Sequence, residues 1–177
     1  MIQVNQSNER EDKCETVLFL PEKGGRIGEG GLRTQGRFKK SYNDKPLVSI
    51  ITVVFNSEKY LENTILSVIS QAYDNVEYII IDGGSTDGTI DIIKKYEDKL
   101  DYWISESDDG IYDAMNKGID LVTGEWVNFV NSSDVLNGNA YTVILDCLVK
   151  NSNKCDVIAF GYSIVKSIKP QQFKTTK

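Results

Sequence analysis

The chain of 177 residues contains no histidine. This absence excludes a Ser-His-Asp or Cys-His nucleophilic system and any zinc site built on histidine. A metal would have to be held mainly by oxygen ligands, which favours Mg²⁺ or Mn²⁺. Cysteine is scarce as well: only Cys14, Cys147 and Cys155 are present, without a Cys-x-x-Cys spacing. This pattern argues against a disulfide framework and is typical of a reducing cytoplasm.

Long hydrophobic runs are also missing. No apolar stretch is long enough to span a bilayer, and residues 1–10 have neither the basic nor the apolar segment of a signal peptide. The net charge of -6 argues against a broad nucleic-acid-binding surface, which would need clustered Lys and Arg. We therefore predict a cytoplasmic protein with no nucleic-acid partner. Docking onto the inner face of a membrane stays open.

A regular pattern begins at Pro46, where runs of β-branched residues alternate with amphipathic segments. Strands are predicted over 48–55, 78–81, 102–105, 126–130 and 156–160. Helices are predicted over 58–71, about 90–98, from Gly110 to Gly124, and over about 140–149. Strands that alternate with helices predict an α/β fold with a mainly parallel sheet. Residues 1–45 are polar and rich in glycine, so we expect a flexible or loosely packed N-terminal extension there.

Two predicted strands lead to acidic residues. One strand ends on Asp82, and another leads to Asp134. Ligands bind outside the carboxyl ends of the strands in an open parallel sheet. We therefore expect the two carboxylates to come from neighbouring strand ends and to form one site for a cation and a polar ligand. The alternatives are local: Asp82 could serve only the Gly83-Gly84 turn, and Asp134 could cap a helix.

Other candidate residues lie near the same strand ends. Phe55 could stack on a flat heterocycle or could be a core aromatic. Asn116 could hydrogen-bond a ligand, and Lys117 could meet a phosphate, although a solvated lysine is the more common case. The segment from Ser85 to Asp87 is interpreted as a helix cap. Asp108 and its neighbour Asp109 are interpreted as solvated loop charges.

Four blocks carry a resemblance to a known family: Pro46–Asn56, Ile79–Thr89, Ser107–Gly118 and Gly124–Asp134. Their order and spacing resemble a family 2 glycosyltransferase of the GT-A fold, over about residues 46–136. The bacterial enzymes that build O-antigen and other surface polysaccharides are the most similar in character. The resemblance implies a Rossmann-like α/β domain over residues 46–177 that binds a nucleotide-sugar.

The resemblance also implies roles for individual residues. Phe55 stands where the family usually has a tyrosine that stacks on the base, and Val53 and Asn56 flank that pocket. Asp82 matches the acid that reads the base, typically uracil. Gly110 and Asn116 would line the nucleotide-sugar, and Asp134 would bind the metal on the diphosphate. The Mn²⁺ or Mg²⁺ would neutralise charge on the departing nucleoside diphosphate.

The sequence departs from the family at two points. The family often has two adjacent acids where this chain has Ser133-Asp134. The family's later half, which supplies the general base and most acceptor contacts, is not matched here. Asp146 and Asp156 are the only acids after Asp134, and neither lies in a recognisable base motif, so the catalytic residue stays unassigned.

The predicted function is an inverting transfer of a sugar, from a nucleoside-diphosphate donor that we expect to be a UDP-sugar. The acceptor would be a glycan or a lipid-linked glycan of a cell-surface polysaccharide. The alternative is a truncated donor-binding remnant without a general base. Two other classes fit poorly. A phospho-receiver domain would need an acidic pair where this chain has Phe55-Asn56, and a Rossmann dehydrogenase would need Gly-x-Gly-x-x-Gly there.

Overall fold

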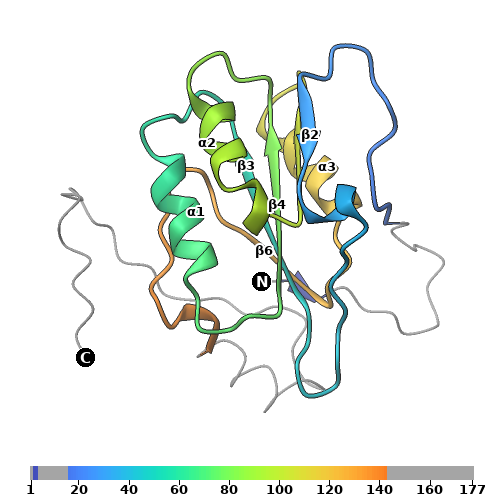
Figure 1. Cartoon of the computed structure of the whole chain (residues 1–177), viewed down its shortest axis with the longest axis vertical. Coiled ribbons are helices and arrows are strands. Elements are labelled where there is room, and N and C mark those ends of the chain that lie inside the picture. Colours follow the sequence, from blue (N-terminus) through green and yellow to red (C-terminus); the bar gives the residue numbers. More distant parts are fainter. Residues whose placement is uncertain (1, 4–15, 143–177) are drawn as a thin grey trace.

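The computed structural model describes residues 2–3 and 16–142, which form a six-stranded sheet with helices on both faces (Figure 1). The strands run in the spatial order β1-β6-β3-β4-β5-β2. Their bounds are Ile2–Gln3 for β1, Gly28–Gly30 for β2, Val48–Val54 for β3, Val76–Asp82 for β4, Tyr102–Ser105 for β5 and Trp126–Phe129 for β6. The four central strands are parallel, and the edge strands β1 and β2 are antiparallel to their neighbours.

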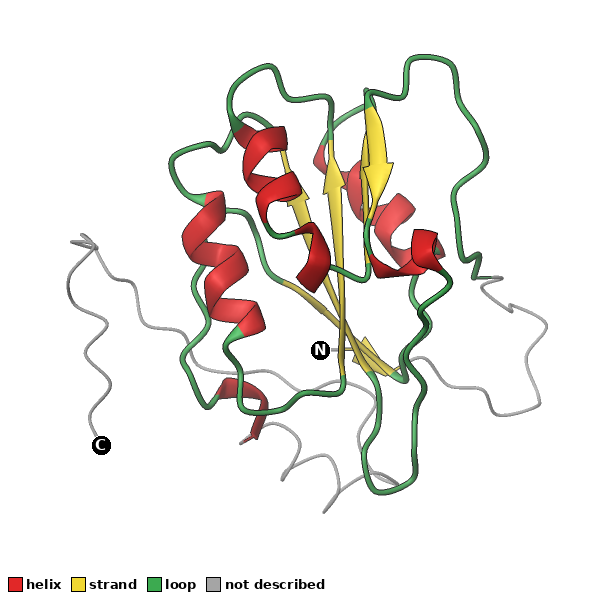
Figure 2. Ribbon diagram, viewed as in Figure 1, coloured by secondary structure: helices red, strands yellow, loops and turns green. Residues whose placement is uncertain are grey.

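Helices α1, α2 and α3 cover the sheet (Figure 2). Their bounds are Leu61–Ile69 for α1, Thr89–Lys95 for α2 and Ile111–Asp120 for α3. Helices α1 and α2 lie on one face, and α3 lies on the other (Figure 1). Two short 3₁₀ helices, η1 over Leu32–Gln35 and η2 over Glu97–Lys99, flank β5. The arrangement confirms the predicted α/β class with a mainly parallel sheet.

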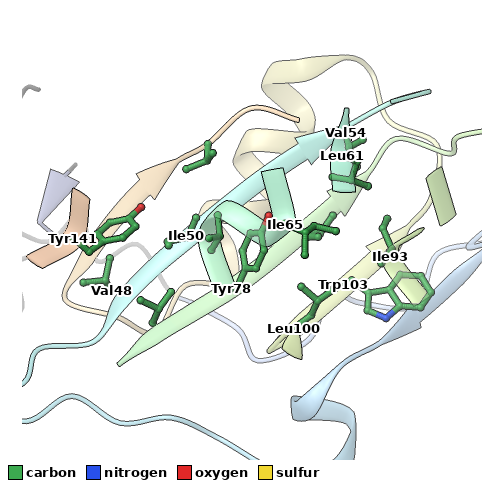
Figure 3. Close-up of a cluster of buried hydrophobic side chains, with 14 of the residues drawn as sticks. Val48, Ile50, Val54, Leu61, Ile65, Tyr78, Ile93, Leu100, Trp103 and Tyr141 are labelled. Atoms are coloured by element: carbon green, nitrogen blue, oxygen red, sulfur yellow. The ribbon is translucent and has the colours of Figure 1, made fainter. Parts of the chain in front are cut away.

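Alternation along the strands divides the core into two layers. Ile50 and Val54 of β3 pack with Leu61 and Ile65 of α1 on one face, a cluster that Figure 3 shows. Ile51 points to the other face and packs in the cluster that includes residues of α3. Every residue of β3 and β4 is buried, as expected for parallel strands covered on both sides. The continuous apolar runs in the sequence thus have a direct structural cause.

The N-terminal segment differs from its prediction. Residues 16–45 do not form a loose extension: β2 pairs with β5, and Arg33 of η1 is buried. The guanidinium of Arg33 lies 2.5 Å from Oε1 of Glu77 on β4, and it also donates a hydrogen bond to the carbonyl oxygen of Leu121 at 2.8 Å. The predicted boundary at residue 46 is therefore not a boundary in the packing, because the segment before it completes the sheet and the charge balance of the core.

The last predicted elements lie largely outside the described residues. The helix expected from residue 140 is present at residues 140–142, and the strand expected at 156–160 falls in the part that the structure does not describe. None of the helices within residues 16–142 has both the length and the hydropathy needed to cross a membrane.

Candidate functional site

The carboxyl ends of β3, β4, β5 and β6 lie at one edge of the sheet, and the loop after each carries candidate residues. These loops are bound to one another. Gly83 donates its backbone N–H to the carbonyl oxygen of Val54 at 2.9 Å, and Glu106 donates to that of Asp82 at 3.0 Å. The hydroxyls of Ser57 and Ser132 are 2.9 Å apart. The loops therefore form one connected surface, supported by the rigid sheet below.

The loop after β3 presents an aromatic ring and a constrained turn. Phe55 is 62% exposed, so it is not a core aromatic. Asn56 has a φ of 48°, the one positive φ of a non-glycine residue in the described segments. Its Oδ1 accepts the N–H of Thr86 at 2.9 Å, and its own N–H donates to the hydroxyl of Ser85 at 2.8 Å. A left-handed asparagine is thus held by its neighbours, while Phe55 beside it stays free to meet a ligand.

Asp82 at the end of β4 is completely buried. Its Oδ2 accepts the N–H groups of Gly84 at 3.2 Å and Ser85 at 3.0 Å and the hydroxyl of Ser105 at 2.6 Å; its Oδ1 accepts the hydroxyl of Ser85. In this conformation the carboxylate organises the turn and has no surface for a ligand. The geometry favours the turn-forming alternative, and the contact with a base stays a prediction.

Asp134 lies in the loop that follows β6, and its side chain is exposed. Its Oδ2 accepts the side-chain N–H of Asn131 at 3.1 Å, and its carbonyl oxygen accepts the hydroxyl of Thr64 in α1 at 2.8 Å. The expected convergence with Asp82 is wrong in one respect. Strand β3 lies between β4 and β6, so the two strand ends are about 10 Å apart rather than neighbours.

The residues present fit a metal only together with a ligand. Within residues 2–3 and 16–142, no group of three or more His, Cys, Asp or Glu side chains is placed to hold a metal ion. Mg²⁺ typically binds one or two carboxylates and completes its coordination with water and phosphate oxygens. The exposed carboxylate of Asp134 meets that requirement, since a diphosphate would supply the remaining oxygen ligands.

The loop after β5 is fixed from both sides. Glu106 is buried, and its carboxylate contacts Arg26 at 3.2 Å and Lys117 of α3 at 3.1 Å. Lys117 also lies 3.3 Å from Asp113, so it is neither a solvated lysine nor one free to meet a phosphate. These charges fix the loop between Glu106 and α3 in place. Glu106 was not singled out in the sequence because its partners are 80 and 11 positions away.

The other predicted residues separate into buried and exposed ones. Val53 is 7% exposed and packs in the core, where it supports the site from below. Gly110, with a φ of 108°, is the N-cap residue before α3 and is exposed, as is Asn116 within that helix. Asp108, interpreted as a solvated charge, is half-buried and lies against Gly83.

Comparisons with known proteins give the family and support the fold. A family model described as glycosyl transferase family 2 matches residues 49–173. The chain belongs to this family. The putative teichuronic acid biosynthesis glycosyltransferase TuaG of Bacillus subtilis is 37% identical over 127 residues, which are 70% of this chain and 49% of TuaG. The chain spans about half or less of the length of the curated relatives it matches.

Solved structures support the fold. S. aureus TarS 1-349 in complex with UDP-GlcNAc has a TM-score of 0.56 and 27% identity, over 60% of this chain and 32% of that one. A mannosyltransferase from Pyrobaculum calidifontis, solved with GDP-Man and Mn²⁺, has a TM-score of 0.51 at 22% identity, over 63% and 35%. The second likeness supports the fold alone. Both agree with the expected GT-A architecture.

Proposed function

We propose that the chain is the donor-binding part of an inverting family 2 glycosyltransferase. It takes a nucleoside-diphosphate sugar, with UDP as the nucleotide, and serves transfer of the sugar to a hydroxyl of a glycan or lipid-linked glycan in cell-surface polysaccharide synthesis. The observation that carries the proposal is the exposed Phe55 on the same loop surface as the exposed Asp134, at the carboxyl edge of the sheet. TarS solved with UDP-GlcNAc and the TuaG relative support the nucleotide and the acceptor class.

In this proposal the donor contacts the loops that follow two different strands. Phe55 after β3 stacks on the base, and Asn56 holds the shape of the turn next to it through Thr86. Gly110 and Asn116, both exposed at α3, face the nucleotide-sugar. Asp82 positions this surface from within, through Ser85 and Ser105, rather than by direct contact.

Asp134 holds the diphosphate side. A bound Mn²⁺ or Mg²⁺ supplies charge neutralisation to the leaving nucleoside diphosphate. Two contacts hold Asp134 in place. Thr64 of α1 donates a hydrogen bond to its backbone carbonyl oxygen, and the side chain of Asn131 donates one to its carboxylate. The carboxylate that deprotonates the acceptor hydroxyl is not assigned to any described residue.

The test has two readouts. Calorimetry should show metal-dependent binding of UDP to the chain, and incubation with UDP-GlcNAc and other UDP-sugars should release UDP through transfer or slow hydrolysis. Binding without any turnover would favour the donor-binding remnant over the enzyme. A chain that binds no nucleoside diphosphate, with or without Mn²⁺, would contradict the proposal.

A further inference from the structure

The buried state of Asp82 raises the question of which group contacts the edge of the base. All of its hydrogen-bonding partners are internal, and the side chain has no exposed surface. A base-reading acceptor must instead lie on the surface near Phe55. Such an acceptor would be an acid in the loops at the carboxyl edge of the sheet that is fixed in place and has one oxygen to which no described residue donates a hydrogen bond.

Asp108 meets this description. If Gly83 carried a Cβ, that atom would lie 2.5 Å from Oδ2 and 3.0 Å from Cγ of Asp108. The carboxylate thus fills the space that a side chain at position 83 would take. Gly83 itself is hydrogen-bonded to Val54, the residue before Phe55. The acid of the β5 loop and the exposed ring of the β3 loop are therefore both adjacent to the same glycine turn.

The side chain of Asp108 is held at one oxygen only. Its Oδ1 accepts the N–H of Gly110 at 2.9 Å, which fixes the side chain at the start of α3. The loop that carries it is anchored by the ion pairs of Glu106 with Arg26 and Lys117. Among the residues that the structure describes, none donates a hydrogen bond to Oδ2 of Asp108. This oxygen is a positioned acceptor without a donor.

We propose that Asp108 is the base-specificity residue of the donor site and that its Oδ2 accepts the N3–H of uracil. The assignment deepens the proposed function and rests on it. A carboxylate accepts hydrogen bonds but cannot donate them, so it favours a ring nitrogen that carries a proton. Uracil has a proton at N3, whereas cytosine presents a lone pair there. Asp108 therefore favours binding of UDP over CDP, whereas stacking on Phe55 and the contacts with the diphosphate contribute equally to the binding of both nucleotides.

A purely structural role for Asp108, in the turn that begins α3, makes a different prediction. Asp108→Asn keeps the Oδ1 that accepts the Gly110 N–H, but it places a donor or a neutral acceptor at the base. We expect the ratio of UDP affinity to CDP affinity, measured by calorimetry at constant Mn²⁺, to fall by about tenfold or more in this variant. Loosening of the turn alone would weaken the binding of UDP and of CDP equally and leave the ratio of the two affinities unchanged. That result would overturn the proposal.

Asp109→Asn is the matched control, because Asp109 is an exposed acid in the same loop and, among the residues that the structure describes, only its backbone N–H makes a hydrogen bond. The control should keep the wild-type ratio. An equal fall of the ratio in both variants would mean that loop charge, not Asp108, sets the preference, and it would also overturn the assignment.

A second variant moves the carboxylate. Gly83 does not have a positive φ, so it can carry a side chain once Asp108 is shortened. The double variant Gly83→Asp with Asp108→Ala should recover most of the UDP preference that Asp108→Ala alone loses. Failure of the relocated acid to recover any preference, in a protein with wild-type circular dichroism, would count against the proposed location of the base.

The outcomes separate the two proposals. If the wild-type chain binds UDP and the Asp108→Asn ratio does not change, donor binding stands and the role of Asp108 falls. If the wild-type chain binds neither UDP nor CDP, the donor site itself is wrong, and the inference falls with it.

Discussion

At the amino ends of β4 and β5, the buried carboxylates of Glu77 and Asp101 are matched by cations from the N-terminal segment. Arg33 lies 2.5 Å from Glu77, and Lys39 lies 2.8 Å from Asp101. At the carboxyl end of β4, Asp82 is equally buried but is surrounded by hydroxyl and N–H donors without a cation. The same sheet therefore stabilises its buried acids in two ways, at its two ends.

The difference between the two ends indicates that one contributes mainly to stability and the other mainly to ligand binding. Ion pairs at the amino end connect distant parts of the chain, since Arg33 and Glu77 are 44 positions apart in the sequence. Neutral donors at the carboxyl end only shape a local turn, and acids such as Asp108 and Asp134 keep oxygens available. We infer that the amino end contributes most to the stability of the fold and that the carboxyl end keeps carboxylate oxygens available for the donor and metal proposed above.

The largest expected effect comes from removing a buried ion pair at the amino end of β4. Arg33→Ala should lower the free energy of unfolding by about 3–5 kcal/mol, because it leaves the buried carboxylate of Glu77 without its cation. Urea unfolding followed by circular dichroism measures this. Arg37→Ala, at an exposed arginine four residues later, should change it by less than about 0.5 kcal/mol. Equal effects of the two changes would mean that the buried pair contributes nothing specific.

Asp82→Ala tests the other end of the same strand. It removes the acceptor of two hydroxyls and two N–H groups and should destabilise the fold by about 2–4 kcal/mol. The exposed Asp120→Ala serves as the control, with little expected change. If Asp82→Ala instead kept full stability and lost uridine binding, the direct base contact expected from the sequence would be correct, and the turn-forming role would be wrong.

Asp134→Ala addresses the exposed acid. Removal of the carboxylate that is proposed to bind the metal should weaken Mn²⁺-dependent UDP binding by about 1.5–3 kcal/mol, with the fold unchanged because the side chain is exposed. Calorimetry with and without EDTA separates the metal-dependent part. Asp98→Ala, an exposed acid next to the amino end of β5, should leave UDP binding unaltered. Metal-dependent affinity that survives in the Asp134 variant would remove this residue from the metal site.

The sequence was sufficient for the central fold. The apolar runs around Ile50 and Ile79 have the composition of buried parallel strands, and the structure forms β3 and β4 there. The strand β2 was missed because Gly28–Gly30 has no hydrophobic alternation, and because the buried pair of Arg33 and Glu77 involves residues far apart in the chain. Local patterns do not contain such long-range contacts.

The candidate site was predictable only in part. The turn chemistry near Asp82 and the loop leading to Asp134 predicted polar residues at the carboxyl edge of the sheet, and the structure has them there. Strand order is not a local property, so the insertion of β3 between β4 and β6 was not visible. For the same reason the proximity of Asp108 to Gly83, which are 25 positions apart, could not be anticipated from spacing.

The smallest expected effect lies at the amino end, where the hydroxyl of Tyr73 donates a hydrogen bond to the carbonyl oxygen of Pro46. Burial raises the pKa of Tyr73 to about 12. Because the folded pKa lies above the unfolded value of about 10, the contribution of Tyr73 is complete below pH 10 and is lost as the pH rises through 12. Tyr73→Phe should therefore lower the free energy of unfolding by about 1 kcal/mol at pH 7. Between pH 10 and 12, the free energy of unfolding of this variant should fall less steeply with pH than that of the wild type.

Urea unfolding at several pH values measures both effects. Tyr112→Phe, at a residue that is 79% exposed, is the control and should follow the wild type throughout. Parallel curves for Tyr73→Phe and the wild type would show that this hydroxyl does not contribute to the stability of the amino end.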